Sequence, residues 1–367
     1  MTKKHIPSLS RQTGMTLIEL MIAMILGLIL IAGVLYVFLG SSKTFRTSDA
    51  LARVQENGRF GLEAISGDLR MISYTGCVSM QVLNPESVVS GLSSDDLFSA
   101  GNVVRGYPYS SGDPIVGPIV GPLGVPGSDV IIVRHLSESV VELNGDMLSS
   151  SDPIVLKKTA YTPKFEEKQI VAIADCDKMH IFRITNVAET TTTVSLSHAV
   201  GTAPNGNTMA TLGNDKLVYG ALLGAKTVRL VEQAYYVKNT GRLNTAGQPV
   251  FGLFRRATVA GIATGAAEEE LAEGVEDMRI SYGLDTDGTD GYVNNYVGAS
   301  TITAQQWESV VSIRIELLVS SVQNASLDSP QAYTFNGTTT TPADRKLRTS
   351  IGSTVSLRNR DHIRASN

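Results

Sequence analysis

The hydrophobic pattern of this chain changes abruptly near its N-terminus. The first fourteen residues are polar and carry three basic side chains and no acid. From Leu20 to Leu39 every residue is apolar, a glycine or Tyr36. At 1.5 Å per residue, these roughly twenty positions form about 30 Å of helix, which matches the hydrocarbon core of a bilayer. We therefore expect a membrane-spanning segment over residues 15–40, with residues 1–14 in the cytoplasm and the remainder exported.

The helical pattern continues beyond this segment. Apolar or small residues recur at steps of three or four and form one stripe along a helix, namely Leu51, Val54, Gly58, Leu62, Ile65, Leu69 and Ile72. Since no proline occurs between Met15 and Tyr74, we expect one long helix there, whose amphipathic half (residues 41–74) packs on a globular domain. A soluble coiled coil is the alternative, but the stripe is short and contains glycine. Gly58, Gly61 and Gly67 each cost about 1 kcal/mol relative to alanine, which predicts close packing or a bend.

The remaining residues, 75–367, have a pattern typical of β-structure. Short β-branched runs alternate with turn residues, and residues 107–128 are rich in Gly and Pro, which predicts a loop. The expected strands are Val130–Leu136, Ile170–Ile173, His180–Val187, Thr193–His198, Thr227–Lys238, Val250–Arg255, Met278–Tyr282 and Val310–Ser320. Asn144-Gly145 is a hairpin turn signal, and Thr240-Gly241 lies in a second candidate turn between Lys238 and Val250. A short helix is expected around Glu268–Val275. The predicted fold class is α+β, a long N-terminal helix packed on an antiparallel sheet with a large β-rich elaboration.

Composition narrows the function classes. Hydrophobic residues make up 43% of the chain and charged residues 18%, so most of it should fold. The net charge of -4 favours neither a nucleic-acid binder nor an acid-coated surface protein. Cys77 and Cys176 both follow the apolar segment, and one cysteine pair in an exported domain predicts a disulfide. A disulfide between them would close a loop of about a hundred residues, which is worth about 4–5 kcal/mol in the chain-entropy model. Two unrelated buried thiols are the alternative.

An acidic residue at the start of the apolar segment needs an explanation. A secretory signal peptide has a shorter apolar region of about 7–15 residues and gains nothing from a carboxylate. Here Glu19 stands within MTLIELMIAM. An ionised side chain at mid-membrane costs roughly 2.5–3.5 kcal/mol on insertion scales, so the carboxylate indicates a function.

The run from Gly14 to Met21, GMTLIELM, resembles the class III prepilin signal of type IV pilins and type II secretion pseudopilins. The resemblance implies that a prepilin peptidase cuts between Gly14 and Met15 on the cytoplasmic side and methylates the amine of Met15. It also implies a pilin-like fold and a role for Glu19 in assembly. The positive amine of one subunit would meet Glu19 of its neighbour inside an apolar bundle, where an unpaired charge is costly and register is therefore fixed. Glu19 paired only with its own amine is the alternative.

The later part of the chain resembles the PilW minor pilins. The similar segments are Tyr74–Cys77, Leu271–Gly283 followed by Asp285–Gly288, Trp307 with Val310–Leu318, and Ser356–Arg360. The resemblance implies a minor pilin that primes assembly of a type IV pilus and is incorporated into it. Its implied partners are the prepilin peptidase, minor pilins of the PilV, PilX, PilE and FimU types, the major pilin and a tip adhesin. It further implies a single-pass inner-membrane protein with a periplasmic globular domain that reaches the cell surface in the pilus.

The loop from Asp285 to Gly291, DTDGTDG, is a candidate calcium site. Carboxylates alternating in a glycine-bent loop, here Asp285, Asp287 and Asp290, suit a hard cation. The spacing departs from the EF-hand pattern, and a solvated turn is the alternative, because Asp and Gly are turn residues in any case. No other cofactor is expected.

Other charged groups do not indicate catalysis. The five histidines are scattered, with His198 expected to pack inside the fold, and no nucleophile elbow, Walker loop or HExxH spacing occurs, so we predict that the chain is not an enzyme. Glu268–Glu270 are expected to begin a solvated helix. Basic residues gather at the C-terminus, namely Arg345, Lys346, Arg348, Arg358, Arg360 and Arg364. Exposed arginines suit DNA phosphates, but a solvated sheet edge or a contact with another pilin is favoured.

Two alternatives to a type IV minor pilin stay open at this point. A J-type minor pseudopilin of a type II secretion system would carry the same signal. A signal-anchored periplasmic binding protein or adhesin would need neither Gly14 nor Glu19.

Overall fold

The structure is a computed structural model. It describes residues 14–72, 86–90, 101–136, 140–175, 177–201, 206–212, 219, 226–258, 268–288 and 290–357. The chain divides into two compact units, Met1–Leu51 and Ala52–Asn367.

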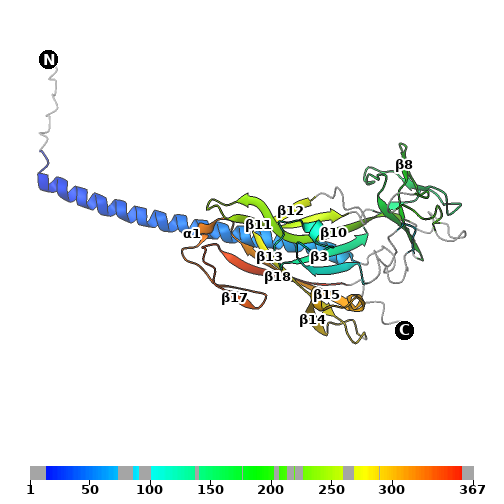
Figure 1. The fold of residues 1–367 in the computed structure, drawn as a ribbon. Helices are drawn as coiled ribbons and strands as arrows, with labels where there is room; N and C mark the ends of the chain where they lie inside the picture. The colour runs from blue at the N-terminus through cyan, green and yellow to red at the C-terminus, as the bar shows by residue number, and fades with distance from the viewer. Residues whose placement is uncertain are drawn as a thin grey trace, which may run out of the picture. The chain divides into compact units, whose positions relative to one another are not determined.

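The long helix expected from the sequence is present as α1, Leu17–Met71 (Figure 1). In the second unit its stripe is buried, with Val54, Leu62, Ile65 and Leu69 no more than 6% exposed. Two of its glycines lie against the sheets. A Cβ at Gly58 would overlap the end of the Ile351 side chain, and one at Gly61 would lie 2.8 Å from Leu253 Cδ2. The predicted close packing is therefore confirmed at these two positions.

The largest sheet of the described residues has nine strands. Its path is β1-β7-β6-β10-β11-β12; β3 also pairs with β10 and with β2, and β4 pairs with β10. The strands are β1 (Glu86–Ser87), β2 (Val104–Pro108), β3 (Asp129–Leu136), β4 (Val141–Glu142), β6 (Ile170–Ala174), β7 (Met179–Arg183), β10 (Lys226–Leu243), β11 (Pro249–Thr258) and β12 (Glu268–Glu273).

A second sheet of four strands has the order β14-β13-β15-β18. It contains β13 (Val275–Leu284), β14 (Asn295–Gly298), β15 (Val310–Ser320) and β18 (Arg348–Ser356), with 3-10 turns η1 (Ala299–Thr301), η2 (Gln305–Ser309) and η3 (Asn324–Ser326) in the connections. Two small sheets complete the described fold, a hairpin of β16 (Tyr333–Phe335) and β17 (Thr338–Thr340), and a three-stranded sheet of β5 (Ile154–Lys157), β9 (Thr193–Ser197) and β8 (Asn186–Glu189).

One hydrophobic core joins the second half of α1 to both large sheets. Ile65 and Leu69 belong to the same buried cluster as Tyr235 of β10 and Ile315 and Leu317 of β15. A polar contact accompanies this packing, because the Tyr235 hydroxyl donates to the Asp68 carboxylate at 2.5 Å. A separate core lies among β4, β5, β6, β7 and β9, where Ile154 and Phe182 are fully buried. The α+β class with a β-rich elaboration is confirmed.

The acidic run is a strand and not the start of a helix. Glu268–Glu270 lie on β12, which pairs antiparallel with β11. Cations of neighbouring strands hold the carboxylates, with Arg255 2.6 Å from Glu269 and Arg242 2.6 Å from Glu270. Backbone pairing with β11 and burial of Ala272 override the local helical preference of glutamate, and the exposed ion pairs add little to this. The expected helix over Glu268–Val275 was therefore wrong.

The expected strand His180–Val187 is two strands in different sheets. β7 ends at Arg183 and pairs with β6, whereas β8 begins at Asn186 and pairs with β9. The backbone changes partner between them, since the Ile184 amide donates to Gln169 O and the Thr185 amide donates to Ser197 O.

Three turn predictions met different outcomes. Gly241 has a φ of +78°, but it lies at a register shift within the β10–β11 pair, and the chain reverses later, near Gly247 (φ +73°). After Asn144-Gly145 the chain continues to Ile154 before the next strand, so this turn is no two-residue hairpin. The Gly/Pro-rich loop contains one short helix, α4 (Gly117–Val120).

Candidate functional site

The predicted cleavage site lies directly before the first turn of α1. Gly14, Met15 and Thr16 are outside the helix and exposed, and Met15 is 68% exposed. A Cβ at Gly14 would have no heavy atom within 4 Å. Nothing in the described part of the chain requires glycine here, so any requirement for it comes from a partner that binds this segment.

Glu19 takes part in a capping box at the start of α1. The Thr16 hydroxyl accepts a hydrogen bond from the Glu19 amide at 3.3 Å, and the Glu19 carboxylate accepts one from the Thr16 amide at 3.4 Å. This reciprocal arrangement satisfies two amides that a helix start leaves without partners. The T-x-x-E spacing could have revealed it from the sequence, but the sequence reasoning considered only an amine as the partner of Glu19. Both residues follow the expected cleavage point, so the box does not depend on the leader.

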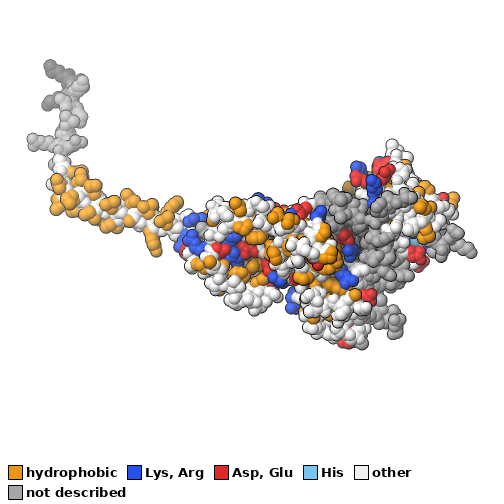
Figure 2. Space-filling view, viewed as in Figure 1, with side chains coloured by type: hydrophobic (Ala, Val, Ile, Leu, Met, Phe, Trp, Pro, Cys, Tyr) orange, Lys and Arg blue, Asp and Glu red, His pale blue; other side chains and the backbone are white. Residues whose placement is uncertain are grey.

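The first unit presents an apolar helical surface. Side chains from Leu17 to Leu39 are exposed, with Leu30 at 71% and Tyr36 at 81% (Figure 2). Of the described residues, α1 alone is long and apolar enough to cross a membrane, and none of its most apolar stretch is buried in the protein. Such a surface needs lipid or another apolar partner, because each fully exposed large aliphatic side chain forgoes about 1.5–3 kcal/mol of burial. The helix therefore indicates membrane anchoring.

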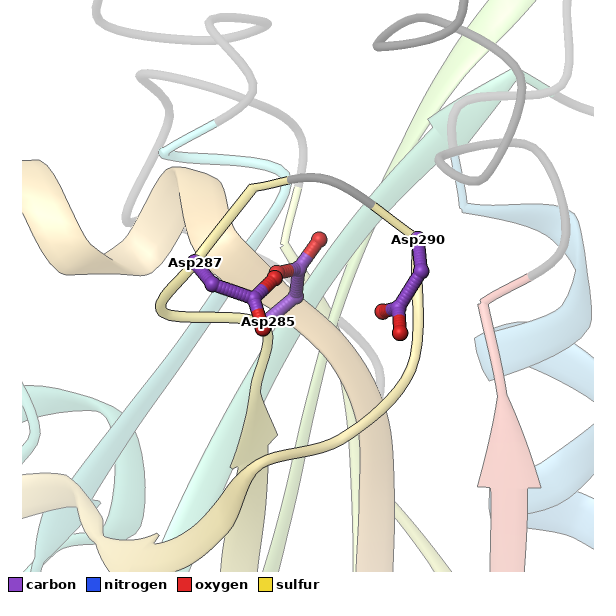
Figure 3. Close-up of side chains that lie close together, drawn as sticks. All are labelled: Asp285, Asp287 and Asp290. Carbon is purple, nitrogen blue, oxygen red and sulfur yellow. The ribbon is translucent and has the colours of Figure 1, made fainter.

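The candidate calcium residues lie on one loop between β13 and β14. Asp285, Asp287 and Asp290 place carboxylate oxygens within 4.8 Å of one another (Figure 3). Asp285 is 1% exposed, and the other two are exposed.

The three carboxylates also accept hydrogen bonds from within the loop. Asp285 accepts from the Gly288 amide at 2.7 Å, Asp290 from the Tyr292 amide at 2.9 Å, and Asp287 from the Asn294 side-chain amide at 3.0 Å. These bonds are typical of Asp in turns. The donor set suits calcium, yet the same contacts serve a turn without metal, so calcium binding stays a prediction for calorimetry.

The described basic residues of the C-terminal cluster are largely engaged within the fold. Lys346 is 5% exposed, and Arg348 binds Glu276 at 2.6 Å and Asp344 at 2.6 Å. The hydrogen bond from Arg348 holds the pKa of Asp344 below its usual value. Arg345 is exposed, whereas Arg358, Arg360 and Arg364 lie outside the described residues. A buried ion-pair network therefore replaces the expected solvated edge at Lys346 and Arg348, which sequence spacing alone does not reveal.

The described histidines are packed. His198 is 3% exposed and its Nε2 lies 2.9 Å from Asp152 O, as expected for a structural histidine. His180 lies 2.5 Å from the Tyr219 hydroxyl through Nδ1, and burial lowers its pKa. In the described part of the chain, the one group of three potential metal-ligating side chains is the aspartate loop.

The predicted disulfide cannot be placed. Cys77 and Cys176 both lie outside the described residues. The pairing stays a prediction, which non-reducing peptide mapping tests.

Two family models match the chain. A model of the prokaryotic N-terminal methylation motif matches residues 9–35, which span the cleavage site, the capping box and the apolar part of α1. The model of type IV pilus-assembly protein W matches residues 234–359, about a third of the chain. Together, the two matches support a PilW-type minor pilin. No curated protein and no solved structure matches it.

The two matches fall on different parts of this pilin. The PilW match covers the second half of β10, β11, β12 and the whole four-stranded sheet, including the aspartate loop. The small sheet of β5, β8 and β9 lies between the two matched ranges. The matches thus cover the anchor, the four-stranded sheet and the β10–β12 part of the larger sheet, whereas β1 to β4, β6 and β7 lie outside both.

Proposed function

We propose that this pilin primes assembly of a type IV pilus and is then incorporated into it. The observation that carries the proposal is the start of α1, where an exposed glycine, a helix cap that contains Glu19 and an unburied apolar surface follow one another. A protein that only needed an anchor would need the third of these features and neither of the first two. No catalytic step is part of this role.

The proposed processing uses the accessibility of the Gly14–Met15 peptide. Both residues are exposed and non-helical, so the bond between them is open to a peptidase. Cleavage there leaves the amine of Met15 next to the capped turn. The positive end of the helix dipole favours a carboxylate at this place, so Glu19 is positioned to accept the amine of a neighbouring subunit in exchange for its own Thr16.

The proposed partners follow from this role. They are the prepilin peptidase, the major pilin, minor pilins of the PilV, PilX, PilE and FimU types, and a tip adhesin above the complex. The proposed location is the inner membrane, with the leader in the cytoplasm and the β-rich unit in the periplasm, followed by the cell surface after assembly.

Gly14→Ala tests the processing step. Because a Cβ at this position meets nothing in the described chain, the variant should fold normally and fail only at the peptidase. We expect a full-length, unmethylated precursor in the inner membrane and loss of surface pili, read by intact mass and by counting pili. Normal cleavage of this variant would overturn the proposal.

Glu19→Ala tests the assembly step separately. We expect normal cleavage and methylation but at least threefold less of this protein in sheared pili. Thr16→Ala is the matched control, because it weakens the same cap without removing the carboxylate. Equal loss in both variants would assign the effect to the helix cap and not to the charge.

A further inference from the structure

A polar cleft lies on the face of the four-stranded sheet that points away from α1. Its volume is about 320 Å³, and its floor is formed by Arg279, Ser281, Arg314 and Glu316. Successive side chains of a strand point to opposite faces. Ile313, Ile315 and Leu317 of β15 are fully buried in the core shared with α1, so Arg314 and Glu316 lie on the other face.

The two acids of the cleft are already engaged. Glu316 accepts from the Ser350 hydroxyl at 2.5 Å and from the Asn336 amide at 3.2 Å. Asp129 accepts from the Ile280 amide at 2.7 Å. Burial raises the pKa of Asp129 to about 6, so its charge is weakened further at mildly acidic pH. Glu316 keeps its negative charge because its donors are neutral, but within the described residues neither acid forms an ion pair with Arg314.

The two arginines of the cleft, in contrast, keep hydrogen-bond donors without a carboxylate partner. Arg314 is exposed and stacks on the Tyr296 ring at 4.1 Å, and within the described residues no carboxylate lies within ion-pair distance of it. Arg279 donates to Gly127 O and to Asp277, but its buried Nε has no partner among the described atoms. The stacking fixes the plane of the Arg314 guanidinium, which pre-organises its donors for a planar acceptor.

We propose that this cleft binds an aspartate or glutamate side chain of a neighbouring protein subunit, with Arg314 as the carboxylate-binding residue. The guanidinium fork matches a carboxylate with two parallel hydrogen bonds. A free small anion is the poorer occupant, since one exposed ion pair is worth about 0–1 kcal/mol by itself. Such a pair gains selectivity when a larger interface supplies the affinity, because it fixes register and excludes like charge. The inference rests on the proposed function only in taking the partner to be another pilus subunit.

The chemistry is tested on the full-length mature protein in detergent micelles, labelled with ¹⁵N-arginine. The probes are the blocked tripeptide acetyl-Gly-Glu-Gly-amide, its Gln counterpart and sodium acetate. We expect the Glu peptide and acetate each to shift the Arg314 Nε signal weakly and the uncharged Gln peptide to shift it at least fivefold less. The signal is assigned by its absence from Arg314→Gln. Arg345, exposed outside the cleft, serves as the internal control. An Arg314 signal that moves no more than that of Arg345, or equally with the Gln peptide, would overturn the proposal.

The interface is tested in cells. We expect Arg314→Glu to lower surface pili at least tenfold with the cleaved, methylated protein at its normal level, Arg314→Lys to retain at least half, and Arg345→Glu to match the unsubstituted protein. Normal piliation of Arg314→Glu would overturn the interface. This result is separable from failure of the proposed function, because Gly14→Ala would then still abolish pili.

Discussion

The two halves of α1 have similar apolar residues and opposite surroundings. In the first unit, Leu30 and Phe38 are 71% and 65% exposed, whereas in the second unit Ile65 and Leu69 are fully buried. The difference lies in what else the chain provides. The second half has two sheets to pack against, and the first half has no protein surface of the described chain over its apolar side chains. Hydrophobicity alone therefore does not distinguish an anchor from a core helix; the presence of polar residues between the apolar ones does.

The largest effect that tests this comparison is a cavity in the packed half. Leu69→Ala should lower the free energy of unfolding by about 2–5 kcal/mol, because Leu69 is fully buried in the core. Leu30→Ala, the matched change in the exposed half, should alter it by less than about 0.5 kcal/mol. Chemical unfolding of the β-rich unit in micelles measures both. Equal losses in the two variants would break the comparison.

The second test compares one carboxylate from each unit. Burial raises the pKa of Asp129 to about 6, so the folded protein holds a proton that the unfolded chain releases near pH 4. The folded state binds more protons between these values, and its stability therefore falls as pH rises from 4 to 6, by up to about 3 kcal/mol from this group.

Asp129→Asn should remove this fall, while Glu19→Gln, which lies in the exposed unit, should leave the profile unchanged. Unfolding curves at pH 4, 5, 6 and 7 measure the slope. A profile of Asp129→Asn identical to that of the unsubstituted protein would contradict the assignment.

The third test adds volume to the packed half. A side chain at Gly58 meets Ile351 and Val319, so Gly58→Val should cost about 1–3 kcal/mol through overpacking. The matched change Gly33→Val lies where a Cβ meets nothing, and it should leave unfolding of the β-rich unit unaffected. Thermal melts followed by circular dichroism separate the two. A melting temperature of Gly58→Val no lower than that of Gly33→Val would show that the close approach is not required.

The smallest effect has the opposite sign. Gly67 lies in the packed half, but a Cβ there meets no heavy atom within 4 Å. Gly67→Ala should therefore gain about 0.5–1 kcal/mol from helix propensity without a steric cost. Denaturant midpoints measure the gain. A loss of stability would indicate that the bend expected from the sequence is needed at this glycine.

Sequence periodicity was sufficient for the elements whose burial has one regular period. The extent of α1 followed from its stripe, and the predicted bounds of β15, Val310–Ser320, agree with the structure. It failed where partners from distant segments decide. Glu268–Glu270 form a strand because they pair with Phe254–Arg256 of β11, and no local pattern contains those residues.

The functional residues also separate into those that a local motif predicts and those that only tertiary contacts bring together. The motif around Gly14 and Glu19 is local, so its position at the start of α1 could be predicted. The cleft could not, because the register of β13 and β15 brings Arg279 and Arg314 together, and Asp129 of the other sheet joins them through the Ile280 amide. The Thr16–Glu19 cap was within reach of sequence reasoning and was overlooked.

The long hydrogen bonds of that cap bear on how an acid can reside in an apolar anchor. The contacts of the Glu19 carboxylate with the Thr16 amide and hydroxyl, at 3.4 and 3.5 Å, are weak, but both donors belong to the same helix turn. The Glu19 carboxylate therefore keeps hydrogen-bond donors within its own chain, and it loses little free energy when a stronger donor replaces them. If the proposed function holds, leaving the bilayer exchanges the Thr16 donors of Glu19 for the amine of a neighbouring subunit, and this exchange is reversible until that amine is bound.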